Sequence, residues 1–361
     1  MGVKNHSFLF FFNEKDKNDK IIVMKEAYLY KKMKGGKVKC QNCAHYCVID
    51  KERRGFCGVK ENKNGKLYAL NYGKAIALNI DPIEKKPLFH FLPGTKTFSL
   101  ATVGCNFKCS SCQNYDISQG ASNLKTIPGK DLSPEEIIET VKERNLPSIS
   151  YTYTEPTIFS EYALDIMKLA KKNNIKNVWV SNGFLSKELL ELISPYLDAI
   201  NIDLKSFSDD FYKEYCKARI NPVLETIKRI KKKEIWLEIT TLVIPTLNDS
   251  EKEIKSIAKF IKKDLGENTP WHITRFSGSI SWKLQELPET SIETIKRSWE
   301  IGKKEGLKYV YTGNIPGLPS EDTFCPKCNQ LVIDRNGYQI HRYDNKGKCP
   351  KCDYNLNLTV S

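Results

Sequence analysis

The stretch TVGCNFKCSSCQN, residues Thr102–Asn114, holds three cysteines at C-x3-C-x2-C spacing. They are Cys105, Cys109 and Cys112, and no fourth cysteine stands near them in the sequence. Three thiolates around a 4Fe–4S cluster leave one iron without a protein ligand, and an open coordination position marks a catalytic metal site. The spacing alone also allows a zinc site completed by a histidine. The loop therefore favours, without proving, a catalytic iron–sulfur site.

The sequence from Thr97 onward alternates short β-rich runs with amphipathic helical segments. In SPEEI, Ser133 and Glu136 form a capping box around Pro134 in the first helical turn. Such strand–helix repeats imply a parallel sheet with right-handed crossovers, and about six units favour a partial (β/α)6 TIM-like barrel. The expected strands are residues 97–104, 148–154, 177–183, 199–205, 236–244, 270–276 and 308–313.

Polar residues follow or end several of these expected strands. In barrels of this kind the active site lies at the C-terminal ends of the strands, so these residues are the candidates for binding. They are Thr154, Glu155, Asn182, Asp203, Lys205 and His272.

Two further cysteine sets flank the barrel, and clustered thiols in a chain without a secretion signal indicate metal rather than disulfides. Two CPKC turns are joined by a predicted hairpin with Asn336 and Gly337 at its turn. Four thiolates complete a tetrahedral zinc site, so structural zinc is predicted at Cys325, Cys328, Cys349 and Cys352.

The N-terminal set is less specific in its spacing. Its C-x2-C-x3-C-x9-C pattern allows zinc or a second iron–sulfur cluster, and His45 could replace one of the cysteines. The remaining cysteine of the chain, Cys216, is expected to be a partly buried helical residue. The members of the N-terminal set are Cys40, Cys43, Cys47 and Cys57.

These patterns divide the 361 residues into four segments. Residues 1–23 are predicted to be a disordered extension, or to precede the true start at Met24. Residues 24–96 form a Cys-rich subdomain, residues 97–313 the barrel, and residues 320–361 a zinc-ribbon-like module.

Composition narrows the class of protein. A hydrophobic fraction of 40% and a charged fraction of 28% are typical of a globular chain, and no apolar run reaches membrane length. We therefore expect a cytoplasmic protein. The net charge of +14 allows nucleic-acid binding, but the lysines alternate with Glu along helical patterns, which favours a solvated surface.

The C-x3-C-x2-C motif directly after the first strand of a βα repeat resembles the signature of radical S-adenosylmethionine (radical SAM) enzymes. The resemblance implies that the amino and carboxylate groups of SAM chelate the open iron of the cluster at Cys105, Cys109 and Cys112. An electron from a donor then splits the sulfonium, and a 5′-deoxyadenosyl radical takes hydrogen from a substrate. No side-chain acid or base is required for the cleavage, so no catalytic residue is expected beyond the cluster.

The resemblance extends to the strand ends. YTEP, Tyr153–Pro156, stands where the family has a GGEP-like motif that receives the SAM amino group, although Tyr153 and Thr154 replace both glycines. SNG, Ser181–Gly183, resembles the ribose-contacting strand end. DLK, Asp203–Lys205, and His272 resemble SAM contacts of glycyl-radical-enzyme activases, with a structural ion pair and a buried imidazole as the alternatives.

A narrower resemblance runs from Met24 to the end of the chain. It is carried by CQNCAHYC, GFCGVKEN, DPIEKKPLFHFLPG, LVIPTLND, PWHITRF and the terminal CPKC turns. These motifs resemble the AmmeMemoRadiSam-system radical SAM protein, a family related to pyruvate formate-lyase activating enzymes. The resemblance implies an activase-like oxidoreductase with a protein substrate, and Ammecr-like and Memo-like proteins as partners.

Two other functions stay open at this stage. Radical SAM modification of RNA is motivated by the basic charge and the zinc ribbon. A non-enzymatic scaffold, with zinc at all three cysteine sets, is the alternative from another class.

Overall fold

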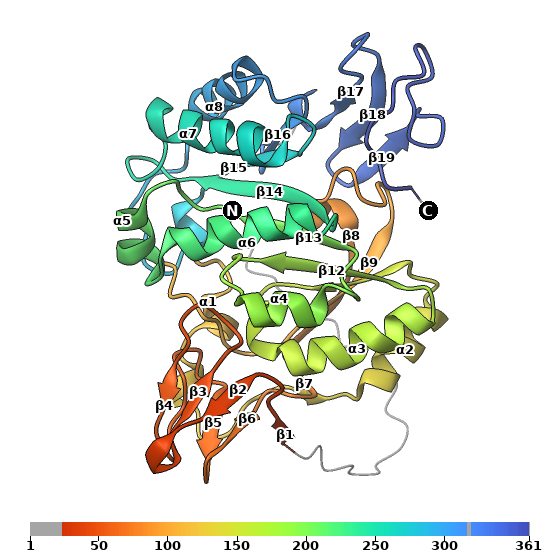
Figure 1. Ribbon diagram of the computed structural model, residues 1–361. Coiled ribbons are helices and arrows are strands. Elements are labelled where there is room, and N and C mark those ends of the chain that lie inside the picture. The colour runs from red at the N-terminus through yellow and green to blue at the C-terminus, as the bar shows by residue number, and fades with distance from the viewer. Residues whose placement is uncertain (1–23, 316–318, 361) are drawn as a thin grey trace.

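The computed structural model describes residues 24–315 and 319–360, and its centre is an eight-stranded sheet (Figure 1). The strand order is β16-β15-β14-β13-β12-β11-β9-β8. Neighbours from β9 to β16 pair in parallel, whereas β8 pairs antiparallel with β9. The parallel strands follow one another in chain order, which is the order of a barrel rather than of a doubly wound sheet. No pairing joins β8 to β16 within the described residues, so the barrel is partial.

All seven parallel strands expected from the sequence are present. The strand β8 is an additional one, which the sequence did not reveal because Asn79, Asp81 and Pro82 interrupt its apolar pattern. The bounds are β8 Ala77–Pro82, β9 Lys96–Ala101, β11 Ser148–Tyr151, β12 Lys176–Ser181, β13 Ala199–Asp203, β14 Trp236–Val243, β15 Trp271–Arg275 and β16 Val310–Gly313.

Helices cover the outer face of this sheet, as Figure 1 shows. The predicted capping box of α2 is confirmed: Ser133 Oγ accepts from the Glu136 amide at 3.2 Å, and the Ser133 amide donates to Glu136 at 2.6 Å. None of the described helices has the length and apolar character needed to cross a membrane. The bounds are α2 Pro134–Glu143, α3 Ser160–Lys172, α4 Lys187–Ile193, α6 Ile220–Lys232, α7 Glu251–Phe260 and α8 Ile292–Lys304.

The N-terminal cysteines lie at the end of β3 and on loops beside two small antiparallel sheets, at the bottom of Figure 1. Asn42 Nδ2 donates to Ser160 Oγ at 2.8 Å, and the buried ammonium of Lys60 pairs with the buried carboxylate of Glu161. These contacts fix the sheets to the start of α3. The two sheets are β1-β6-β5 (Lys25–Glu26, Lys66–Ala69, Lys60–Lys63) and β2-β3-β4 (Tyr30–Lys32, Val38–Cys40, Val48–Ile49).

The C-terminal cysteines lie on a three-stranded sheet of β17 (Thr323–Phe324), β18 (Leu331–Asn336) and β19 (Gln339–Arg342). The predicted hairpin between β18 and β19 is confirmed, but its turn is Gly337–Tyr338, because Asn336 ends β18 and pairs with Gln339. Hydrogen bonds join this module to the segment between β8 and β9, among them Thr359 N to His90 O at 2.8 Å. Others are Arg335 Nη2 with Phe89 O at 2.8 Å, Leu92 N with Thr359 O at 2.8 Å, and His90 Nδ1 with Asn357 O at 3.0 Å. The predicted extension, residues 1–23, lies outside the described residues.

Candidate active site

The loop of Cys105, Cys109 and Cys112 leaves β9 at its C-terminal end, as the barrel predicts. Its backbone is held by a π-helical turn at Tyr212–Cys216: the Lys108 amide donates to Cys216 O at 2.9 Å and the Ser110 amide to Tyr215 O at 2.8 Å. Cys216 is therefore fully buried rather than partly buried, and its side chain hydrogen-bonds that of Cys109.

The three thiols of this loop are not gathered around the position of a single ion in this structure. Among the described residues, the three sulfur atoms do not all lie within 4.8 Å of one another. No group of three metal-binding atoms that combines these sulfurs with a histidine nitrogen or a carboxylate oxygen meets that distance either. Burial raises the pKa of Cys105 and Cys112, so metal binding there must displace protons. Two buried polar atoms beside the loop, Asn106 Nδ2 and Gln119 Oε1, have no partner within the described part of the chain. Wide thiol spacing and free polar groups fit an iron–sulfur cluster with a polar ligand.

Glu155 joins the ends of two neighbouring strands. Its Oε1 accepts from the amide and hydroxyl of Thr157, at 3.1 and 2.6 Å, and from Ser181 Oγ at 2.9 Å. Its Oε2 accepts from the Asn182 amide at 2.8 Å. Burial raises the pKa of Glu155, and these four donors oppose that rise. The carboxylate thus positions the residues after β11 and β12 rather than pointing freely into a cavity.

Asn182 and Thr154 connect these strand ends to the cysteine loop. Asn182 Nδ2 donates to Asn106 Oδ1 at 2.7 Å, and Thr154 Oγ1 donates to Thr102 O at 2.8 Å. Asn106 is a site residue that sequence reasoning missed. The signal was its place between Cys105 and Cys109, within the metal-binding loop itself.

Tyr153 takes a left-handed backbone conformation, with φ of 63°, at a position where the related motif has glycine. Its backbone oxygen accepts from Asn114 Nδ2 at 2.9 Å. Its hydroxyl donates to Asp81 on β8, and Lys86 Nζ lies 4.6 Å from the ring centroid. These side-chain contacts offset the strain of a non-glycine residue there, so the turn keeps a glycine-like shape.

Asp203 ends β13, and Asp203 and Lys205 both lie near Cys109 of the cysteine loop. Lys205 Nζ donates to Asp203 Oδ2 at 3.1 Å. Burial lowers the pKa of Lys205, but Asp203 and the thiols of Cys109 and Cys216 raise it, and the net shift is upward. Lys205 therefore stays a cation beside the thiols. The Asp203–Lys205 ion pair, which is the structural alternative to a role in SAM binding, is present and lies beside the cysteine loop.

His272 lies two strands from Asp203 in the same register of the sheet, because Asp203 is paired with Thr240 and Thr240 with His272. It is the second residue of β15, near the N-terminal end of that strand and not at its C-terminal end as expected. Strand β15 continues three residues beyond His272, to Arg275. His272 Nε2 lies 2.7 Å from Glu238 Oε2, and its ring stacks on Tyr311 with centroids 5.4 Å apart. A role for His272 in SAM binding stays a prediction.

The C-terminal cysteines have a different geometry. The Sγ atoms of Cys325 and Cys352 lie 3.6 Å apart, as do those of Cys328 and Cys349, and all four lie within 4.8 Å of one another. A tetrahedral ion with metal–sulfur bonds of about 2.3 Å separates its sulfurs by about 3.8 Å. The set is thus arranged for one four-coordinate ion.

Comparisons with known proteins agree with this arrangement. The model of the Radical SAM superfamily matches residues 99–261. An uncharacterized protein of Methanocaldococcus jannaschii is 47% identical over 340 residues, which are 93% of this chain and 100% of that protein. The pyruvate formate-lyase-activating enzyme of Clostridium pasteurianum is 26% identical over 222 residues, 57% of this chain and 89% of the relative.

A solved radical SAM methyltransferase from Sphaerobacter thermophilus is similar at 15% identity and a TM-score of 0.47, over 62% of this chain and 67% of that one. The family match spans β9 to α7, which includes the cysteine loop and the strand ends described above. The chain belongs to the radical SAM superfamily.

Replacing Glu155 by Gln should lower the free energy of unfolding by roughly 1–3 kcal/mol, because one accepting oxygen becomes an amide donor facing the Asn182 amide. Urea titration of the purified variants measures this. Glu139→Gln on the exposed face of α2 is the matched control and should change stability by less than about 0.5 kcal/mol. Equal effects of the two substitutions would contradict the positioning role of Glu155.

Replacing Cys328 by Ser should remove about one zinc ion per chain, because three thiolates and a hydroxyl no longer close the tetrahedral site. Metal analysis by mass spectrometry gives the count. Lys327→Ala, an exposed position in the same turn, serves as the control and should keep its zinc. If Cys328→Ser and the parent hold the same zinc, the C-terminal set is not a zinc site.

Proposed function

We propose that this protein is a radical SAM enzyme of the glycyl-radical-activase type, which takes a hydrogen atom from a glycine residue of a partner protein. The observation that carries the proposal is the loop of Cys105, Cys109 and Cys112 at the C-terminal end of β9, whose thiols are not gathered around the position of a single ion in this structure. When bound, a 4Fe–4S cluster with SAM supplies an oxidising carbon radical after one electron arrives from a donor.

The residues of the chain then have three tasks. The three thiolates hold the cluster, and Asn106 with its unpartnered Nδ2 offers a donor beside it. The backbone at Thr154 receives the SAM amino group, in a turn held open by Tyr153. Glu155 keeps this turn and Asn182 in register, so that Asn182 can contact the ribose.

Asp203 and Lys205 complete the site electrostatically. An ammonium group that stays charged beside Cys109 attracts the SAM carboxylate, and Asp203 is an acceptor for an ammonium. The Nε2 atom of His272 is hydrogen-bonded to Glu238. His272 would therefore contact SAM through Nδ1, or would only shape the interior of the barrel. The barrel wall excludes water from the reacting groups, which limits side reactions.

The protein substrate is proposed from the relatives. Besides the Clostridium pasteurianum enzyme, the (2S)-3-sulfopropanediol dehydratase activating enzyme of Klebsiella oxytoca is 26% identical over 166 residues, 44% of this chain. A glycine of a partner protein is the corresponding acceptor here. Ammecr-like and Memo-like proteins are the candidate partners that the sequence resemblance suggests.

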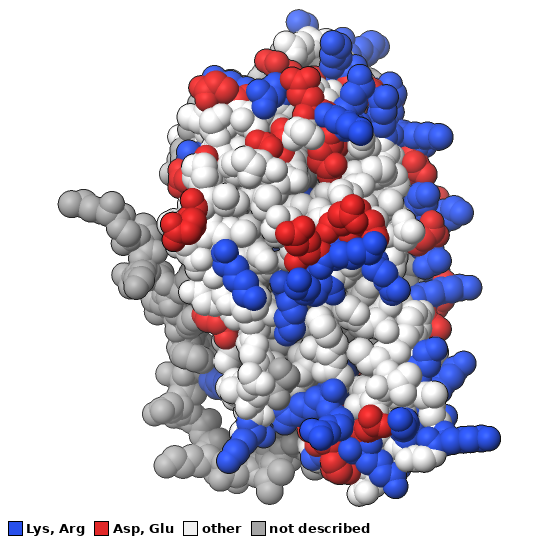
Figure 2. Space-filling model, turned by 90° about the vertical axis from the view of Figure 1, so that its left-hand side faces the viewer, with Lys and Arg blue, Asp and Glu red and all other residues white. Residues whose placement is uncertain are grey.

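RNA as the substrate is less well supported by the surface. On the face shown in Figure 2, Lys and Arg lie among Asp and Glu rather than in a continuous basic area. Many of the lysines have acidic neighbours, for example Lys228 with Asp264 at 3.3 Å and Lys233 with Glu191 at 2.7 Å. A nucleic-acid interface requires basic groups free to contact phosphates.

Reconstituted anaerobically with iron and sulfide and then reduced, the protein should convert SAM to 5′-deoxyadenosine and methionine. The triple variant Cys105→Ala, Cys109→Ala, Cys112→Ala should lose this activity at least about 100-fold, because the loop then has no thiolate to hold iron. Liquid chromatography with mass detection measures the product. Gln113→Ala, an exposed change in the same loop, is the control. Equal product from the triple variant and the parent would refute the proposed function.

With a candidate partner labelled with deuterium at glycine, deuterium should appear in 5′-deoxyadenosine. Anaerobic pull-down with Ammecr-like and Memo-like proteins selects the partners to label. Deuterium transfer from RNA instead, together with RNA affinity that falls steeply with salt, would replace the protein substrate by RNA.

A further inference from the structure

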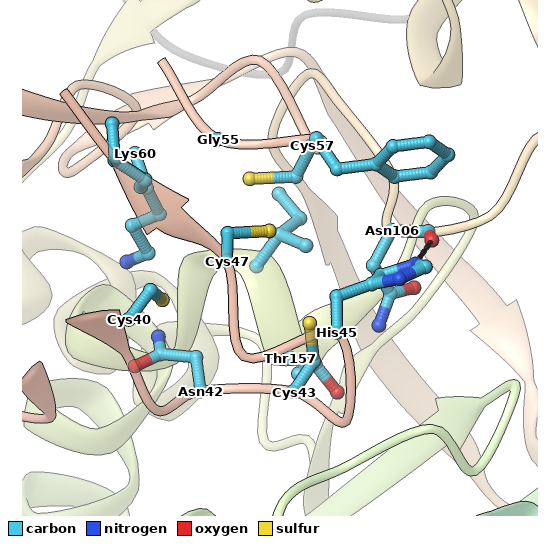
Figure 3. A pocket seen from close by; sticks show the side chains of 13 residues that line it. Cys40, Asn42, Cys43, His45, Cys47, Gly55, Cys57, Lys60, Asn106 and Thr157 are labelled. Carbon is cyan, nitrogen blue, oxygen red and sulfur yellow. Dashed lines mark hydrogen bonds between the residues drawn. The ribbon is translucent and has the colours of Figure 1, made fainter. Parts of the chain in front are cut away.

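Four cysteines of the N-terminal subdomain surround one cavity, shown in Figure 3. Cys40 ends β3, Cys47 directly precedes β4, and Cys43 and Cys57 lie on the loops beside these strands. The sulfur atoms of Cys43, Cys47 and Cys57 point into the space between them in Figure 3. The Cys40 amide donates to Cys47 O at 2.9 Å, which holds the two strand ends together. These cysteines converge in space although they span 18 positions of the sequence, Cys40–Cys57.

Their sulfur atoms are not gathered around the position of a single ion in this structure. The C-terminal set has pairs of sulfurs 3.6 Å apart and meets the 4.8 Å limit throughout. Within residues 24–315 and 319–360, no three N-terminal thiols meet that limit, with or without His45. The same is true of the thiols at Cys105, Cys109 and Cys112. The N-terminal set therefore has the open spacing of the radical SAM loop, and four irons and four sulfides fill such a space.

The cavity between the cysteines is open to solvent on one side, and its exposed walls are almost entirely apolar. Its other walls include the apolar side chains of Ile49, Phe56 and Ile158. A zinc ion occupies only the centre of its ligand tetrahedron, whereas a cubane is a bulky group that suits an apolar wall.

His45 is not placed to complete a zinc site. Its ring packs against Phe56 and Phe184, with centroids 4.5 and 4.9 Å away. Its Nε2 donates to Asn106 O at 2.8 Å, so this nitrogen is already used. The four cysteines are thus the ligands, and His45 instead links their loop to the residue after Cys105.

Backbone amides are arranged around the sulfurs. Hydrogen bonds reach Cys40 from the amide of Asn42, Cys43 from that of His45, and Cys57 from that of Val59. Such N–H···S bonds stabilise bound thiolates and help set the potential of a cluster.

The cavity adjoins the radical SAM loop. A Cβ built on Gly104, which has a φ of 105°, would lie 3.0 Å from Cys57 O and 3.0 Å from Val59 Cγ1. Only glycine allows the backbone before Cys105 to approach the N-terminal loop so closely. Asn106 lines the same cavity. The two cysteine sets are therefore neighbours in one folded body.

From these observations we infer that Cys40, Cys43, Cys47 and Cys57 hold a second 4Fe–4S cluster. All four irons have a protein ligand there, so the site is closed, in contrast to the three-cysteine site next to it. This assignment does not depend on which hydrogen the enzyme abstracts. It predicts that the chain carries two clusters and a single zinc.

Metal and sulfide analysis of the full chain, purified and reconstituted anaerobically, tests the assignment. The parent should hold about eight irons, eight sulfides and one zinc. The Cys43→Ala, Cys47→Ala variant should hold about four irons and the same single zinc. The Cys105→Ala, Cys109→Ala, Cys112→Ala variant should also keep about four irons, and after reduction it should show the electron paramagnetic resonance signal of a 4Fe–4S cluster.

The variant without Cys105, Cys109 and Cys112 keeps the test valid if the N-terminal variant misfolds. Its N-terminal cysteines are intact, so any iron that it holds is bound there. Val48→Ala, an exposed change next to Cys47, is the matched control and should hold as much iron as the parent. About four irons with two zincs in the parent, and no iron in the triple variant, would overturn the assignment while leaving SAM cleavage by the parent unaffected.

Discussion

The hydrogen bonds of the Glu155 carboxylate hold the candidate site together. Four donors from Thr157, Ser181 and Asn182 converge on this one buried side chain. The side chain of Asn182 in turn donates a hydrogen bond to Asn106 in the cysteine loop. The ends of β11 and β12 and the loop after β9 thus form one rigid unit. A buried carboxylate without these donors would carry a large desolvation cost, so the network and the fold stabilise each other.

The three cysteine sets illustrate how one residue type serves different chemistry. At the C-terminus all four sulfurs lie within 4.8 Å of one another, whereas among the described residues the other two sets are more widely spaced. These two sets also lie next to each other, at Gly104 and Cys57. The zinc-type module sits apart, on the segment between β8 and β9, where it covers the sheet rather than the reacting groups.

The sequence revealed the parts of the fold that depend on local pattern. Seven parallel strands, the capping box at Ser133 and the hairpin of β18 and β19 were predictable because periodicity and turn chemistry are written in neighbouring residues. The antiparallel strand β8 was not, since its polar residues are satisfied only by partners elsewhere, such as the Tyr153 hydroxyl on Asp81. Cys216 gave no sequence signal either, although its carbonyl and thiol contact the cysteine loop.

The sequence by itself indicated the class of protein, because the local C-x3-C-x2-C motif after a first β strand resembles the radical SAM signature. Only the tertiary structure decided the spacing of the sulfur atoms, since the separation of side chains distant along the chain depends on packing. The same holds for His272, which the sequence placed with the other candidates and the fold places on Glu238. Residue identity sets which bonds are possible, and the fold sets which atoms are close enough to form them.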